Sequence, residues 1–173
     1  MTTRRAFVTS TIALAGVPAW AARRGPPPKA AFIHWQGPGH ALHGFMAIPD
    51  KAHGRQPAVL VLGQSDEYAR AIAIWVATVG FVACWPKSLD TVDLLATIDW
   101  LATNTYGTGK VAAMLLGAGG DRLSALAPSL ACAIMIGVPG ADARLPILRI
   151  DRLATDAPHD YAQVKAFLKE HLG

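Results

Sequence analysis

The chain has 173 residues, 52% of them apolar and 16% charged, which is enough to bury one continuous core. Its formal net charge is +4, and Arg4, Arg5, Arg23 and Arg24 supply four of the positive charges. A chain that begins after Arg24 is close to neutral, which argues against nucleic acid as a partner.

The N-terminal end carries the pattern of an export signal. Twin arginines, Arg4 and Arg5, precede a mildly apolar run that ends in the small-residue site Ala19-Trp20-Ala21. That run is shorter than the roughly 20 apolar residues that a membrane-spanning helix needs. We therefore expect residues 1–21 to be a twin-arginine signal peptide, with an uncleaved anchor as the alternative. The mature protein would then be exported to the bacterial periplasm through the twin-arginine machinery.

After a linker at residues 22–30, residues 31–173 form one predicted domain. The runs AAFIHWQ and HGFMAIP are rich in strand formers and enclose Gly37-Pro38-Gly39, which predicts a β-hairpin at the sheet edge. The apolar run at 57–62 follows, as expected of a strand covered on both faces. Residues 65–80 then predict a helix that begins near Ser65 or Asp66.

The alternation continues to the C-terminal end. We expect strands at 81–86, 110–116, 131–139 and 145–150, and helices at 88–104, about 120–127 and 161–172. Strands that alternate with helices pair in parallel through right-handed crossovers. The sequence therefore predicts an α/β fold with a doubly wound, mostly parallel sheet. Ligands of such sheets bind beyond the carboxyl ends of the strands.

The two cysteines, Cys84 and Cys132, each lie inside an apolar run that we assign to a separate buried strand. A disulfide needs Cα atoms within about 7 Å, so those strands would have to be neighbours. We expect both cysteines to be small core residues instead.

Seven stretches of the chain follow one another in a characteristic order and spacing. They are HGFMAIP, QPAVLVLGQS, ATVGFVACWP, ATIDWLA, GKVAAMLLGAGGDRLSALA, and ACAIMIGVPG with LPILRI. Together they resemble the dienelactone hydrolase family of α/β-hydrolases over nearly the whole of residues 31–173. The resemblance implies a shortened α/β-hydrolase-like domain that needs no cofactor.

The same resemblance implies where the attacking residue should stand. The family's Gly-x-Cys-x-Gly-Gly elbow lies over residues 115–120 and puts Gly117 at the position of the cysteine. Gly63 and Gln64 occupy the positions of a His-Glu pair, and Lys87 that of an aspartate. Covalent acyl transfer needs an attacking atom and a base that activates it. The sequence therefore predicts a non-catalytic protein.

The carboxyl ends of the predicted strands are the expected binding region. We expect Gly63, Gln64, Gly117, Ala118 and Gly119 to bind a small ester, lactone or carboxylate, or a protein partner. A third hypothesis is a purely structural module of the cell envelope.

A weak hydrolase that uses other residues is the alternative. Gly63-Gln64-Ser65 reproduces half of the Gly-x-Ser-x-Gly signature, although capping of the next helix also explains Ser65. His159 resembles the family's histidine, and Asp151 or Asp156 would be the acid. Eight or fewer residues separate either acid from His159, too few for the strand and helix that the family places there.

Two further kinds of site are disfavoured. Arg122 stands where a nucleotide-binding G-x-G-x-x-G that begins at Gly117 would have its last glycine, so the glycines at 117–120 indicate close packing of turn against helix. His34, His40 and His43 cluster on the hairpin without a neighbouring Cys or carboxylate. We expect them to be exposed and to bind no metal.

Overall fold

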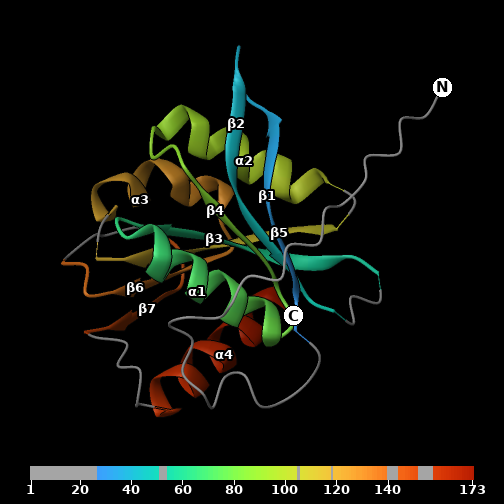
Figure 1. Ribbon diagram of the computed structural model, residues 1–173. Coiled ribbons are helices and arrows are strands. Elements are labelled where there is room, and N and C mark those ends of the chain that lie inside the picture. Colours follow the sequence, from blue (N-terminus) through green and yellow to red (C-terminus); the bar gives the residue numbers. More distant parts are fainter. Residues whose placement is uncertain (1–26, 51–53, 105, 118, 140–143, 152–157) are drawn as a thin grey trace.

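The computed structural model describes residues 27–50, 54–104, 106–117, 119–139, 144–151 and 158–173. The expected signal peptide, residues 1–21, lies outside the described residues. Within them, seven strands form one sheet in the order β1-β2-β4-β3-β5-β6-β7, with helices on both faces (Figure 1).

The N-terminal strands run antiparallel and the others parallel. β1 (Lys29–Gln36) pairs with β2 (Ala41–Ile48) as a hairpin, and β2 pairs antiparallel with β4 (Val82–Pro86). All later pairings are parallel. The other elements are β3 (Gln56–Gly63), α1 (Asp66–Thr78), α2 (Thr91–Thr103), β5 (Gly107–Leu116), α3 (Gly120–Leu126), β6 (Cys132–Ile136), β7 (Ile147–Ile150) and α4 (Pro158–Leu172). The predicted α/β fold with an N-terminal hairpin is confirmed.

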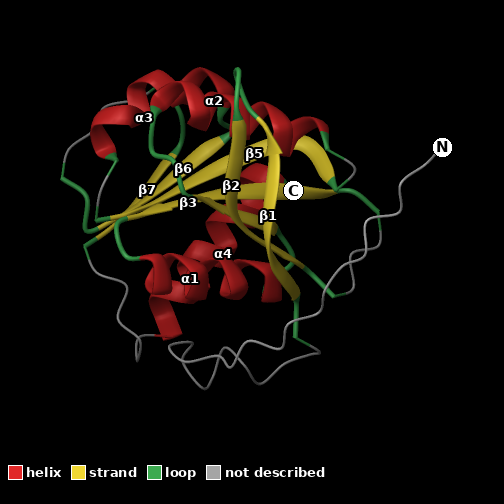
Figure 2. Ribbon diagram, turned by 45° about the horizontal axis from the view of Figure 1, so that its top comes forward, coloured by secondary structure: helices red, strands yellow, loops and turns green. Residues whose placement is uncertain are grey.

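The core has two layers, one on each face of the sheet. Helices α1 and α4 cover one face, and α2 and α3 cover the other (Figure 2). In β3, Val59 and Val61 belong to the layer under α1 and α4, whereas Leu60 and Leu62 belong to the layer under α2 and α3. Successive strand residues point to opposite faces, so a strand covered on both sides must be apolar throughout.

Local signals set the ends of the helices. Asp90 is the N-cap of α2 and accepts a hydrogen bond from the Val92 amide at 2.9 Å. Gly80, with φ +106°, follows α1. α4 begins at Pro158, three residues before the predicted start, because proline is favoured in the first turn of a helix. Among the described residues, no helix has the length and apolar character needed to cross a membrane.

Both cysteines are buried and reduced, as predicted. Cys84 faces the layer under α2 and α3 and Cys132 faces the opposite layer, with β3 and β5 between their strands. Burial raises the pKa of each thiol to about 12, because the charged thiolate is poorly solvated there.

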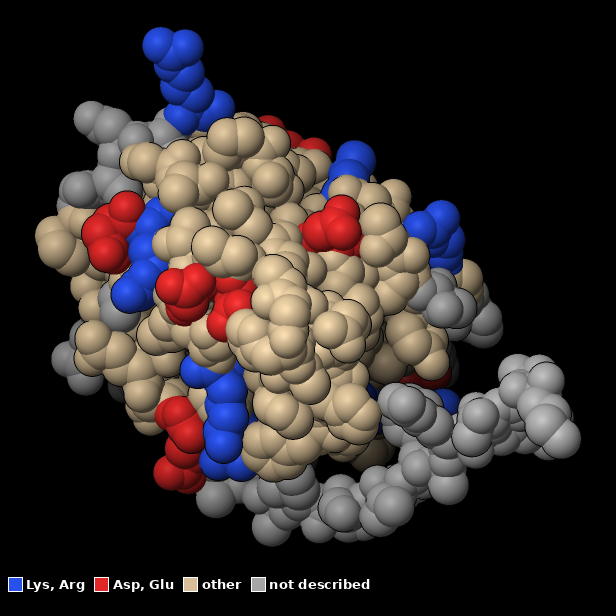
Figure 3. All heavy atoms as spheres, turned by 90° about the horizontal axis from the view of Figure 1, so that it is seen from above, with Lys and Arg blue, Asp and Glu red and all other residues tan. Residues whose placement is uncertain are grey.

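The face seen from above in Figure 1 is mostly uncharged. Its acidic and basic side chains are interspersed and form no single large patch of one sign (Figure 3). This face therefore does not present a concentrated field to a charged partner.

Candidate functional site

The candidate site lies at the carboxyl ends of the neighbouring parallel strands β3 and β5. Gly63 pairs with Leu116 in the sheet register, so the turn that follows β3 lies beside the turn that begins at Gly117. The structure thus brings Gly63 and Gln64 close to the turn of Gly117 and Gly119. Ala118, the remaining predicted binding residue, lies outside the described residues.

Gly117 has a left-handed backbone and open space in front of it. Its φ is +68°, and that of Gly119 is +87°. The Gly117 amide donates to the carbonyl oxygen of Ile136 at 2.8 Å, which anchors the turn to β6. A Cβ at Gly117 would meet no atom within 4 Å. This is a sharp strand-to-helix turn whose exposed residue carries no side chain.

Close packing explains two of the other glycines. A Cβ at Gly63 would lie 3.4 Å from the Cβ of Ala69 in α1, and one at Gly120 would lie 2.8 Å from the Val138 side chain. The bare backbone lets each helix cross close to the sheet. These two glycines therefore serve the packing around the site.

Ser65 is the N-cap of α1. Its hydroxyl oxygen accepts a hydrogen bond from the amide of Tyr68 at 3.5 Å, and the acids Asp66 and Glu67 follow in the first turn. The capping role expected of Ser65 is therefore present, and its side chain lies at the exposed start of the helix.

The other candidate catalytic residues lie at the C-terminal end of the sheet. Asp151 is exposed directly after β7, and His159 is exposed in the first turn of α4. Asp156 lies outside the described residues. In the part of the chain that the structure describes, no hydrogen bond or ion pair joins Ser65, Asp151 and His159.

A polar cluster that the sequence reasoning missed lies at the end of β4. The Ser88 hydroxyl donates to Oδ2 of Asp93 at 2.6 Å, and Nε2 of His40 lies 3.4 Å from Oδ1 of the same carboxylate. Asp93 is three residues after the α2 N-cap, a spacing typical of capping, but His40 comes from the distant hairpin turn. The carboxylate stands between serine and histidine, so the imidazole is not placed to take the serine proton.

The hairpin histidines are exposed, as predicted. The ring centroids of His34 and His43 are 6.2 Å apart across the two strands. The expectation that no carboxylate lies near the histidines is wrong for His40, because the fold brings Asp93 of α2 beside it. In the described part of the chain, no group of three or more His, Cys, Asp or Glu is placed to hold a metal ion.

Comparisons with known proteins find matches through the fold. No protein-family model matches the sequence, and no curated protein matches it. A dienelactone hydrolase-like promiscuous phosphotriesterase from metagenomic libraries matches with a TM-score of 0.68 at 13% identity, over 86% of this chain and 100% of that chain. This chain has an α/β-hydrolase-like fold.

Longer esterases share the α/β-hydrolase-like core. An esterase of the archaeon Pyrobaculum calidifontis matches with a TM-score of 0.55 at 19% identity, over 65% of this chain and 46% of that chain. A thermostable esterase from Pseudomonas putida matches with a TM-score of 0.55 at 18% identity, over 72% and 48% of the two chains. The chain spans about half the length of these esterases, so its α/β-hydrolase-like domain is shortened, as predicted.

Proposed function

We propose that this protein is a non-catalytic binder with an α/β-hydrolase-like fold. It binds a small ester, lactone or carboxylate, or a protein partner, at the strand ends formed by Gly63, Gln64, Gly117, Ala118 and Gly119. One observation carries the proposal: the strand-to-helix turn after β5 has a left-handed backbone, with φ +68° at Gly117, and open space in front of a residue without a side chain.

The physical reason is that acyl transfer needs two kinds of group, one that attacks the carbonyl carbon and one that stabilises the oxyanion. A side chain on such a turn attacks the carbonyl carbon, while backbone amides after the nucleophile and after the third strand bind the developing oxyanion. Here the turns after β3 and β5 still lie side by side. Backbone amides hold a carbonyl or carboxylate oxygen, but they do not attack it. In a serine protease, loss of a triad member leaves only about 10³ to 10⁴ of the rate enhancement over water.

Turnover of a simple aryl ester tests the proposal. We expect purified protein to show no saturable hydrolysis of p-nitrophenyl acetate and no labelling by a serine-directed fluorophosphonate. Saturable turnover that survives repurification would overturn the non-catalytic assignment. Labelling that disappears in Ser65→Ala would identify the alternative, a weak ester or lactone hydrolase using Ser65 with His159 and Asp151 or Asp156.

A thermal-shift screen with lactones and small carboxylates tests the binding half of the proposal. A ligand at a hundredfold its dissociation constant stabilises the folded state by about 2.7 kcal/mol, which is a readily measured shift. A variant with Gly119→Val, which crowds the turn after β5, should lose the shift for a ligand of the strand-end site. If no compound in the screen shifts the melting temperature, the hypothesis of a structural module of the cell envelope is favoured.

The proposed function includes export of the protein to the periplasm. We infer that the twin arginines direct export, because Arg4 and Arg5 precede an apolar run with a small-residue site at its end. Replacing both arginines by lysine should retain the protein in the cytoplasm, as measured by fractionation. Unchanged periplasmic recovery of that variant would exclude the twin-arginine route.

A further inference from the structure

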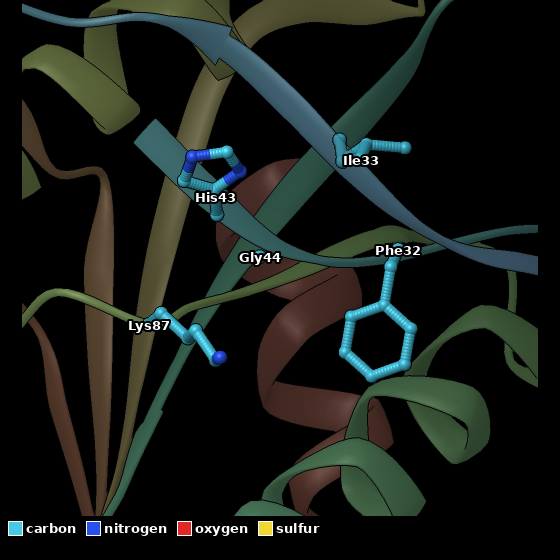
Figure 4. Close-up of a pocket in the computed structure, with 5 residues that line it drawn as sticks. All are labelled: Phe32, Ile33, His43, Gly44 and Lys87. Carbon is cyan, nitrogen blue, oxygen red and sulfur yellow. The ribbon is translucent and has the colours of Figure 1, made fainter. Parts of the chain in front are cut away.

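A second candidate binding site lies between the hairpin and the end of β4. A hollow of about 390 Å³ is lined by Phe32 and Ile33 of β1, His43 and Gly44 of β2, and Lys87 (Figure 4). This volume is within the usual range of about 300–1,000 Å³ for small-molecule sites. None of the five residues belongs to the strand-end site proposed above, so this inference stands independently of it.

Close approach of two strands builds the floor of the hollow. Gly44 lies opposite Pro86, and a Cβ at Gly44 would collide with the carbonyl oxygen of Trp85. One residue beyond this pair, the Lys87 amide donates to the carbonyl oxygen of His43 at 2.9 Å. The backbone therefore brings His43 of β2 and Lys87 at the end of β4 to opposite positions.

The cation at this wall has no counter-charge. Lys87 is exposed, and within the described part of the chain no carboxylate lies within ion-pair distance of its ammonium. In Figure 4 the Lys87 ammonium points from the end of β4 toward the side on which Phe32 lies.

The opposite wall is apolar. Phe32 is 57% exposed, the largest exposure of any aromatic residue that the structure describes on this chain. Its ring packs edge-on against Phe45, with centroids 5.4 Å apart, and the Arg70 guanidinium lies 5.6 Å from its centroid. A second cation thus borders the ring, so the hollow combines apolar surface with positive charge.

We propose that this hollow binds a small organic monocarboxylate, with its apolar body against Phe32 and its carboxylate on the Lys87 ammonium. An ammonium beside a carboxylate forms a charge-assisted hydrogen bond. One ammonium offers few donors, which suits a single carboxylate better than a phosphate dianion. The apolar wall explains why the ligand needs a hydrocarbon part.

Titration with phenylacetate, followed by NMR of the full chain, tests the proposal. Phenylacetamide is the matched neutral probe, since it keeps the ring and loses the charge. We expect saturable shift changes at Phe32, His43, Gly44 and Lys87 with phenylacetate, and binding about fivefold weaker with phenylacetamide, which corresponds to one exposed charge contact.

Two variants separate the walls of the site. Lys87→Gln should weaken phenylacetate binding about fivefold and leave phenylacetamide binding unchanged. Phe32→Ala should weaken both probes, because it removes the shared apolar contact. The matched control is Lys110→Gln, which removes an exposed lysine near the amino end of β5 and should leave both affinities unchanged.

Three results would overturn the proposal: no saturable binding of phenylacetate, equal affinity for the two probes, or wild-type affinity in Lys87→Gln. Shift changes confined to Gly63, Gly117 and Gly119 would also overturn it, and would instead support binding at the strand-end site. Ester turnover by the protein would contradict the non-catalytic assignment without affecting this result, so the two proposals fail separately.

Discussion

The carboxyl ends of β5 and β4 differ in what the chain places after them. After β5 comes Gly117, a left-handed residue with open space and no side chain. After β4 come Lys87 and Ser88, and the Ser88 hydroxyl is held by the buried Asp93 carboxylate. Both turns follow parallel strands at the same edge of the sheet, yet only the turn after β4 begins with residues that carry polar side chains.

This difference shows that the backbone shape of a strand-end turn does not depend on the side chain that the turn carries. A strand-to-helix turn keeps its shape when its exposed residue is glycine, because the backbone bonds come from the neighbouring strand, here Ile136. The side chains on the turn can then change without loss of the fold. The end of β4 is different, because its polar groups are tied to one another and to the hairpin, so they contribute to stability as well.

The largest expected effect is at Gly44 of β2, which pairs with Pro86 at the end of β4. Gly44→Ala places a Cβ against the carbonyl oxygen of Trp85, and a backbone atom cannot move aside easily. We expect a loss of about 3 kcal/mol in the free energy of unfolding, measured by urea denaturation. A change below about 0.5 kcal/mol would show that β2 and β4 do not approach as described.

The polar cluster comes next. Asp93→Ala leaves the part-buried Ser88 hydroxyl without its acceptor and removes the partner of His40, so we expect a loss of about 2 kcal/mol in unfolding free energy. Asp99→Ala is the matched control, since Asp99 is an exposed aspartate on the same helix, and its effect should stay within about 0.5 kcal/mol. Equal effects of the two changes would mean that the cluster contributes no stability.

Gly117→Ala should cost less, although it lies at the candidate site. A Cβ there meets no neighbour, so the remaining penalty is the left-handed backbone, about 1–2 kcal/mol for a residue other than glycine. The same denaturation measurement checks this value. A loss larger than that of Gly44→Ala would reverse the contrast between the two strand ends.

Thiol reactivity tests the openness of the turn at Gly117 against the buried core, without a measurement of stability. Burial raises the pKa of Cys84 and Cys132 to about 12, and only the thiolate reacts, so neither should react with Ellman's reagent in the native protein near pH 8. Reactivity should increase only as pH approaches that raised pKa. Gly117→Cys should add one fast-reacting thiol, because the position is open. A native protein with a reactive thiol would contradict the burial of its two cysteines.

Much of the fold could be predicted because its signals are local. The apolar run at 57–62 became β3, covered on both faces, and Ser65 and Asp90 became helix caps. The glycines of the 117–120 turn follow β5 as expected. A strand period, a cap or a turn depends on residues within a few positions of one another, so a sequence pattern can reveal it.

The sequence by itself determined the order of strands and helices, the apolar character of the central sheet and the absence of a side chain at residue 117. Only the tertiary structure decided that His40 meets Asp93, and that Phe32, His43 and Lys87 line one hollow. These contacts join the hairpin to the end of β4, about fifty residues further along the chain, through the antiparallel pairing of β2 with β4. Strand pairing over that distance depends on how the whole sheet packs, and no local period encodes it.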